Sequence, residues 1–149
     1  MKLRDKISED LMSAMKLRET ERTSVLRMMK AAIRNKEIEI RNELDNPQVL
    51  QVLMTMIRQR KDSVEQYTKG GRLDLSEKEA AEIKVIEEYM PAPVTEDEIR
   101  SVVESVIAET GAKSTKDMGM VMKACMTRFA GRPLDGRKVN ELVKNKLQQ

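Results

Sequence analysis

The segment MPAPVTEDE, Met90–Glu98, decides how this chain is divided. Its two prolines cannot continue a helix, and they stiffen the backbone around them. Directly after them, Thr95 and Glu98 have the spacing of a capping box, which starts a new helix. The sequence therefore predicts an all-α protein with a joint at this point. A bundle of long helices is expected over residues 1–91, and a three-helix subdomain over residues 94–149.

Outside the joint, apolar residues recur at the 3.6-residue spacing of helices, and no stretch has the alternation of a strand. Two of the helices are expected to exceed about twenty residues, which suits an up-and-down bundle with short connections. The predicted helices span residues 3–18, 20–44, 47–69 and 77–90 before the joint, and 96–110, 115–129 and 136–147 after it.

Capping residues mark the expected ends of these helices. Asn46 is predicted to cap the third helix, with Pro47 at its first position. Ser76 and Glu79 have the spacing of a second capping box, at the start of the fourth helix. The pair Gly70-Gly71 supplies the left-handed residue that closes a helix. Further caps are predicted at Thr95, Ser114 and Asp135, and further stops at Gly111 and Gly131.

The composition indicates a folded helical protein with an unusual core. Charged residues make up 36% of the 149 residues and aromatic residues only 2%, whereas methionine occurs 12 times. Such a core is expected to be aliphatic, rich in methionine and therefore adaptable. No apolar run approaches the ~18 residues of a membrane span, and no apolar leader is visible at the amino terminus. We therefore expect a cytoplasmic protein that does not contact a membrane.

Several kinds of catalytic chemistry are missing. The sequence contains no histidine, which removes the usual base at neutral pH and the commonest metal ligand. The one cysteine, Cys125, lies on the apolar stripe of its helix and is interpreted as a buried, inert thiol. No glycine-rich phosphate loop and no serine elbow are present. We predict no catalytic residue, no metal and no bound cofactor.

The net charge of +3 is unevenly distributed. Residues 95–110 contain five acids and one base, whereas residues 111–149 contain nine bases and three acids. A basic end suits an anionic partner, although a modest excess of lysine and arginine also serves simply to keep a small protein soluble. The candidate RNA-binding residues of this end are Lys123, Arg128, Arg132, Arg137, Lys138 and Lys144.

A second basic stripe is predicted on the long helix over residues 20–44. Four of its cations fall within about 60° of one another on a helical wheel, and the stripe either follows phosphates or is a solvated face that pairs with neighbouring acids such as Glu37. One cation of the next helix has no obvious partner at helical spacing. The candidates of this secondary stripe are Arg27, Lys30, Arg34, Arg41 and Arg60.

Several segments together resemble the YqeY family, whose members are small bacterial proteins with a GatB/YqeY domain. The resemblance runs from about residue 3 to residue 147, and the segments keep the order and spacing of the family. Family members usually carry lysine where Met120 stands and glycine where Lys123 stands, so the positive charge is moved by about one turn. The matching segments are LRMMKAAIRNKEIE (26–39), IRQRKDSVEQYTKGGRLDL (57–75), IEEYMP (86–91), KDMGMVM (116–122) and DGRKVNELVK (135–144).

The resemblance implies an all-α fold in two helical subdomains. It also implies similarity to the carboxyl-terminal tail of GatB, a component of the glutamine-dependent aspartyl/glutamyl-tRNA amidotransferase. The family is accordingly described by carbon–nitrogen ligase activity with glutamine as amido-N-donor. In that enzyme the tail contacts tRNA, while the amidase and ATP-dependent chemistry lies in other domains. Because this chain resembles only the tail, the resemblance supports tRNA handling and not catalysis.

Three functional hypotheses follow. The first is a tRNA-binding accessory module, because the scarcity of aromatic residues argues against single-strand recognition and favours a folded RNA bound through its backbone and shape. The second is a protein–protein adaptor that docks on an amidotransferase or an aminoacyl-tRNA synthetase without touching RNA. The third is a component of a tRNA-dependent amidotransferase that has a real enzymatic effect, which would require added tRNA amidation when this chain joins the other subunits. Since no self-sufficient active site is visible, such a component would itself be non-catalytic.

Overall fold

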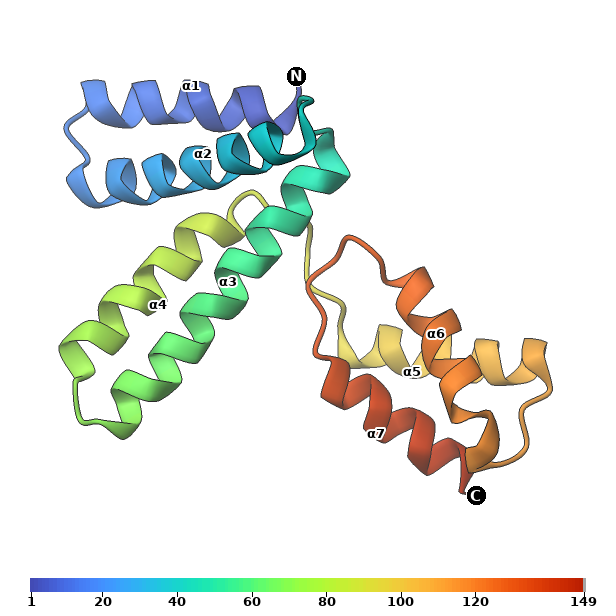
Figure 1. Cartoon of the computed structure of the whole chain (residues 1–149). Helices are drawn as coiled ribbons and strands as arrows, with labels where there is room; N and C mark the ends of the chain where they lie inside the picture. Colours follow the sequence, from blue (N-terminus) through green and yellow to red (C-terminus); the bar gives the residue numbers. More distant parts are fainter. Residues whose placement is uncertain (149) are drawn as a thin grey trace. The chain divides into compact units, whose positions relative to one another are not determined.

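The computed structural model describes residues 1–148, which form α-helices and one short 3₁₀ turn without any strand (Figure 1). The all-α class predicted from the periodicity is therefore confirmed. Contacts between Cα atoms divide the chain into two units, Met1–Met90 and the remainder from Pro91 onward. The division falls at the first proline of the segment that the sequence marked as a joint.

The first unit is made of two helical hairpins. Helices α1 (Leu3–Lys16) and α2 (Thr20–Ile40) form one, and α3 (Asn46–Lys69) and α4 (Leu73–Glu87) form the other. The inward stripes of all four helices meet in one aliphatic core. Its fully buried side chains include Ile7, Leu26, Met29, Leu44, Val49, Leu53 and Ile86.

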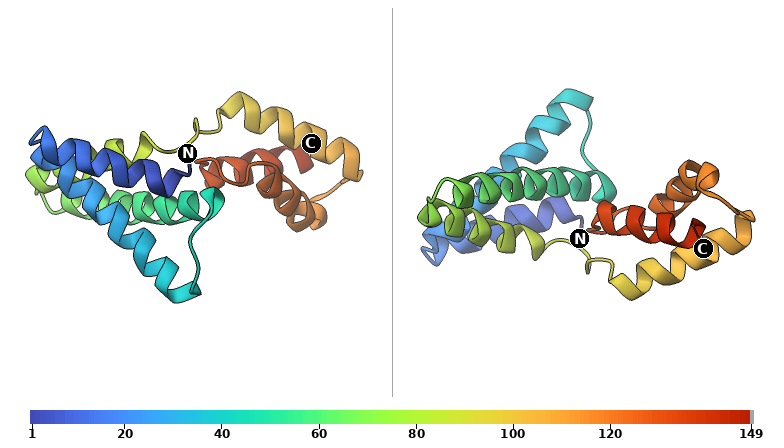
Figure 2. Two further views of the ribbon diagram at one scale, coloured as in Figure 1. Left: turned by 90° about the horizontal axis from the view of Figure 1, so that it is seen from above. Right: turned by 90° about the horizontal axis from the view of Figure 1, so that it is seen from below.

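Helix α2 ends earlier than predicted. Its last residue is Ile40, because Arg41 has a left-handed backbone with φ of 57° and stops the helical hydrogen bonding. The predicted extension to Leu44 is therefore wrong, although Leu44 is buried from the loop that follows. Towards this end α2 diverges from α3 (Figure 2), and a groove of about 580 Å³ lies between the two helices.

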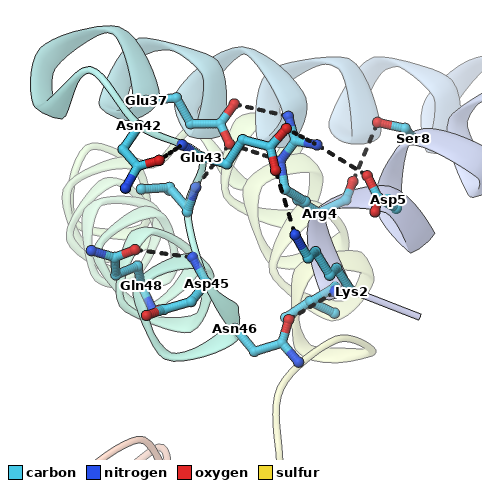
Figure 3. A network of polar contacts seen from close by, with 12 residues as sticks. Lys2, Arg4, Asp5, Ser8, Glu37, Asn42, Glu43, Asp45, Asn46 and Gln48 are labelled. Carbon is cyan, nitrogen blue, oxygen red and sulfur yellow. Dashed lines mark hydrogen bonds and ion pairs between the residues drawn. The ribbon is translucent and has the colours of Figure 1, made fainter.

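The start of α3 also differs from the prediction. Asp45, and not Asn46, is the cap, because its carboxylate accepts from the backbone N–H of Gln48 while the Gln48 side chain accepts from the N–H of Asp45. The Asn46 side chain instead accepts from the backbone N–H of Leu3 at 2.9 Å (Figure 3). The predicted cap thus satisfies a donor at the start of a different helix, α1.

An ion-pair network closes the same end of the bundle (Figure 3). The guanidinium of Arg4 donates to both carboxylate oxygens of Glu37, at 2.7 and 3.0 Å. One of these oxygens also accepts from the backbone N–H of Leu44 at 2.9 Å. Glu43 approaches Arg4 and Lys2 from the loop. The network connects α1, the end of α2 and the connection to α3.

Helix α4 begins at Leu73, four residues before the predicted start at 77. Ser76 consequently lies inside the helix and is buried, and its hydroxyl lies 2.9 Å from Oγ1 of Thr68 on α3. The capping box predicted at Ser76 and Glu79 is therefore wrong. The predicted stop of α3 is confirmed, because Gly70 caps the helix and the next residue, Gly71, has a left-handed φ of 74°.

The second unit is a three-helix assembly of α5 (Glu96–Thr110), α6 (Met118–Arg128) and α7 (Gly136–Leu147), with the 3₁₀ turn η1 (Thr115–Asp117) before α6. The predicted capping box of Thr95 and Glu98 is confirmed at the start of α5. The core is separate from that of the first unit and is formed by residues that include Ile99, Val103, Val106, Val121, Cys125, Phe129, Val139 and Val143.

Candidate nucleic-acid interface

The exposed faces of α6 and α7 carry most of the predicted RNA-binding residues. Lys123 lies on α6, and Arg137, Lys138 and Lys144 lie on α7. All four side chains are exposed, and none makes an ion pair with a carboxylate in the part of the chain that the structure describes. Asp135, beside Arg137, accepts the backbone N–H of that residue and caps α7. These four cations are available to an external anion.

The other two predicted residues of this end are engaged inside the unit. Arg128 pairs with Glu109 and donates to the hydroxyl of Ser105, both on α5. Hydrogen bonding from Arg128 lowers the pKa of Glu109 below its usual value. Because 19 residues separate this pair along the sequence, no helical spacing could have revealed it. Arg128 therefore contributes to packing α6 on α5.

Arg132 is more fully engaged. Its guanidinium lies 2.9 Å from the Glu98 carboxylate and donates to the backbone carbonyls of Ala92 and Pro93 at 3.1 and 3.2 Å. The pKa of Glu98 is lowered first by the backbone N–H of Thr95 and then by Arg132. Arg132 thus holds the proline segment against the start of α5, and its charge is already compensated.

Two ion pairs with α5 identify the sides of α6 and α7 that face α5. Lys146 on α7 pairs with Glu104 at 3.0 Å, as Arg128 on α6 pairs with α5. At 100° per residue, Arg137 and Lys144 lie on the side of α7 away from Lys146, towards α6. On the helical wheel of α6, Lys123 likewise lies on the side towards α7. On the wheel of α7, Lys138 lies on the side towards α5. Lys123, Arg137 and Lys144 therefore lie on the sides of α6 and α7 that face away from α5.

Two further cations without an ion pair precede α6 and were not among the predicted RNA-binding residues. Lys113 and Lys116 are exposed and have no ion pair among residues 1–148. The carboxylate of Asp117, which could have neutralised either, accepts the backbone N–H of Lys113 at 3.0 Å. Both lysines follow Gly111 and precede α6, so they belong to no helical stripe. Their position in a basic segment was the one sequence signal that could have identified them. They enlarge the unpaired charge of the second unit to six cations.

The residues of the secondary stripe on α2 are exposed and have no ion pair in the described residues. These residues are Arg27, Lys30 and Arg34. Their anticipated partner Glu37 pairs with Arg4 instead. Arg41, at the end of the stripe, occupies the left-handed position after α2.

The expectation that Arg60 lacks a partner is wrong. Its Nε lies 3.2 Å from the Glu82 carboxylate of α4, and both side chains are largely buried. A second guanidinium nitrogen contacts the sulfur of Met28 at 3.3 Å. Arg60 is therefore a structural residue of the first core, and its charge is compensated within the unit.

Neither the thiol nor the groove adds a reactive site. Cys125 is fully buried, as predicted, and burial raises the pKa of its thiol. Among the described residues, no cluster of three or more acidic, cysteine or histidine side chains could hold a metal ion. The groove between α2 and α3 is lined mainly by amides and small apolar side chains, and its one cation, Lys36, pairs with Glu39 at 3.3 Å. None of the described helices is both long and apolar enough to span a membrane.

Comparison with known proteins yields relatives of similar sequence in yeasts. The Kluyveromyces lactis protein called altered inheritance of mitochondria protein 41, mitochondrial, is 39% identical over 87 residues, which make up 58% of this chain and 47% of that protein. The protein of the same name from Lachancea thermotolerans is 35% identical over 106 residues, or 69% of this chain and 57% of the relative. An uncharacterized protein of Schizosaccharomyces pombe is 34% identical over 90 residues, or 57% of this chain and 69% of that protein.

The chain spans about half the length of the first two of these curated relatives. A longer match is found with the model of a protein family that is described as Yqey-like protein. This model matches residues 4–147 of the chain. That range includes both helical units and every segment on which the resemblance was based. The chain therefore belongs to the YqeY-like family.

Proposed function

We propose that the second unit binds the phosphate backbone of a structured RNA, and that this RNA is a tRNA. One observation carries the proposal: six exposed cations of this unit have no carboxylate partner among the described residues, whereas its remaining cations are all paired. Unpaired cations retain their full attraction for an anion, because no internal ion pair has to be broken when the anion binds. Three of the six, Lys123, Arg137 and Lys144, lie on the sides of α6 and α7 that face away from α5.

The kind of RNA follows from what these faces lack. Phe129, the one aromatic residue of the second unit, is buried in its core. No ring is therefore available on α6 or α7 to stack an unpaired base, as a single-strand reader requires. Lysine and arginine on helical faces suit contacts to phosphates and ribose along a folded RNA, which are recognised by shape.

The identification of tRNA rests on the resemblance to the amidotransferase tail. The role proposed is accessory: the chain positions tRNA for a glutamine-dependent amidotransferase and carries out no bond-making step. A cytoplasmic location is part of this proposal. The relatives from Kluyveromyces and Lachancea have mitochondrial names, so cell fractionation is needed to place this chain.

The test is binding of purified full-length protein to total tRNA as a function of salt. Replacing Arg137 and Lys144 together by glutamine should weaken binding about tenfold at low salt. If each residue contacts one phosphate, the slope of log K against log salt should become shallower by about two. A matched control replaces Lys78 and Lys84, two exposed lysines of α4, by glutamine and should leave both quantities unchanged. Unaltered tRNA binding by the Arg137 and Lys144 variant would overturn the proposal.

The alternative function is an adaptor that docks on an amidotransferase or an aminoacyl-tRNA synthetase. It predicts a complex with such an enzyme that survives nuclease and high salt, since neither treatment disturbs an apolar protein interface. It also predicts that the Arg137 and Lys144 variant behaves like the parent protein in forming that complex.

A further inference from the structure

The outer surface of the α1–α2 hairpin has features that the RNA-binding proposal does not use. The ion pair between Arg4 and Glu37 fixes one end of this antiparallel hairpin, and the short connection from Leu17 to Glu19 fixes the other. This register brings the second half of α1 beside the first half of α2 (Figure 1). We use the term α1–α2 surface for eight of the exposed side chains of α1, of the connection and of α2 as far as Arg34: Met12, Met15, Lys16, Leu17, Arg18, Arg27, Lys30 and Arg34.

Apolar side chains are unusually exposed on the α1–α2 surface. Met12, Met15 and Leu17 keep 60%, 48% and 69% of their surface exposed. They are not part of the core, which instead buries other residues of α1 and α2, such as Ile7 and Leu26. Exposed apolar side chains grouped on one side of a small protein are typical of an interaction surface. Methionine in particular adapts its shape to different partners.

None of the cations on this surface forms an ion pair among the described residues, whereas seven of the thirteen other cations of the first unit do. The five cations of this surface are exposed and belong to α1, α2 and their connection. Two exposed carboxylates of these helices, Glu9 on α1 and Glu21 on α2, also lack an ion pair among the described residues. Cations elsewhere in the unit commonly have acidic partners: Lys2, Arg4, Arg22, Lys36, Arg60, Lys69 and Arg72.

The backbone conformation at both ends of α2 is strained at an arginine, which supports a functional role for the positive charge of this helix. Arg18, before α2, and Arg41, after it, each have φ of 57°, and they are the only non-glycine residues with positive φ in the described chain. The other positive-φ positions, Gly71, Gly111 and Gly131, are all glycine. A side chain in this conformation costs on the order of 1 kcal/mol that glycine avoids. An exposed arginine in a strained backbone conformation therefore lies before α2 and another after it.

We propose that the α1–α2 surface docks an acidic amphipathic helix of a partner protein. The apolar side of such a helix would cover Met12, Met15 and Leu17, and its carboxylates would meet Arg27, Lys30 and Arg34. The charge complementarity orients the partner and speeds its association, while the buried apolar contacts hold it. The docking site lies in the first unit and is distinct from the RNA surface proposed for α6 and α7.

Two other anionic partners fit these side chains less well. A membrane surface requires an apolar face wide enough to enter the headgroup region, but the apolar faces of α1 and α2 are buried in the bundle. An RNA backbone would place phosphates and their water against three exposed apolar side chains, without an aromatic ring in return. A helix with both apolar and acidic residues satisfies both components of the surface.

The test uses a synthetic helical peptide of about 18 residues, or five turns, with leucine on one side and glutamate on the other. Its binding to the full-length protein is measured by fluorescence anisotropy, beside a scrambled peptide of the same composition. Two variants are compared with the parent: Arg27→Glu with Arg34→Glu, and Met12→Ser with Met15→Ser. The matched control is Lys78→Glu with Lys84→Glu on α4, and circular dichroism confirms that each variant is folded.

We expect each test variant to weaken binding of the patterned peptide at least about tenfold, while the control variant and the scrambled peptide show no such dependence. Equal binding of patterned and scrambled peptides, or parent-like binding by the Met12 and Met15 variant, would overturn the proposal. So would stronger binding of phosphatidylglycerol vesicles or of tRNA through the same residues. The two proposals fail separately, because the Arg137 and Lys144 variant should bind the peptide normally and the Arg27 and Arg34 variant should bind tRNA normally.

Discussion

Nε of Arg60 lies 3.2 Å from Oε2 of Glu82, and the two side chains keep only 12% and 14% of their surface exposed. The pair joins α3 to α4 across 22 residues of sequence. The same guanidinium contacts the sulfur of Met28 on α2. Removing one member of such a largely buried charge pair is costly, because the charge that remains has lost its carboxylate or guanidinium partner and has little access to water.

The first prediction concerns this pair. Glu82→Leu alone should lower the free energy of unfolding of the first unit by about 2–4 kcal/mol, since it leaves the Arg60 charge buried and unpaired. Adding Arg60→Met should recover most of the loss. Both tyrosines of the chain lie in the first unit, so tyrosine fluorescence during urea unfolding reports on this unit. If the double variant instead loses as much stability as the Glu82→Leu and Arg60→Met single variants together, the two residues are not coupled.

The second prediction concerns acid stability. The pKa of Glu37 is lowered, chiefly by the hydrogen bond from Arg4. A carboxyl group whose pKa is lower in the folded state contributes stability above its unfolded pKa of about 4.3 and loses that contribution as the pH falls further. Glu37→Gln should therefore cost roughly 1–3 kcal/mol at pH 7 and make unfolding less dependent on pH below about 4.3. An unchanged acid dependence in urea titrations would contradict this role.

The third prediction concerns alkaline stability. The hydroxyl of Tyr89 donates to the Asp10 carboxylate at 2.5 Å, and burial, followed by this hydrogen bond, raises the pKa of Tyr89. A raised pKa gives stability that is complete below the unfolded pKa of about 10 and declines above it. Tyr89→Phe should remove this decline, as followed by circular dichroism between about pH 9 and 11. Tyr67→Phe, on the same unit, is the control and should preserve it.

The fourth prediction concerns the left-handed arginines. Arg41→Gly should raise the free energy of unfolding by up to about 1 kcal/mol, because glycine adopts a φ of 57° without strain, although its more flexible unfolded chain offsets part of the gain. Arg18→Gly should act similarly. Arg41→Lys, measured in the same urea unfolding experiment, should have no such effect. A loss of stability in both glycine variants would show that the arginine side chains contribute to the fold.

Local signals were sufficient for the helices and for several of their ends. The capping box at Thr95 and Glu98 needs only three-residue spacing, and it was predicted correctly. The end of α2 was not predictable in this way, because Arg41 has no intrinsic preference for the left-handed conformation that stops the helix. Ser76 was misassigned for a related reason: its hydroxyl satisfies a tertiary contact to Thr68, which local spacing does not encode.

Of the candidate site, the sequence identified most of the cations, with Lys113 and Lys116 missed, but not the partners of those that are paired. Arg128, Arg132 and Arg60 find their carboxylates 19, 34 and 22 residues away. Only the packing of helices decides such pairs, so composition overstated the charge that is available for binding. Lys123, Arg137 and Lys144 remain unpaired because their helix faces point away from α5. Their function as RNA ligands stays a prediction.

The two separate cores have a consequence for how the molecule tolerates change. Within the described residues, the apolar cluster of each unit is complete without a side chain from the other. A substitution that melts one cluster therefore leaves the other with its own source of cohesion. We therefore expect the three helices after the prolines to fold without the first unit, so that gene fusion could join them to an unrelated enzyme.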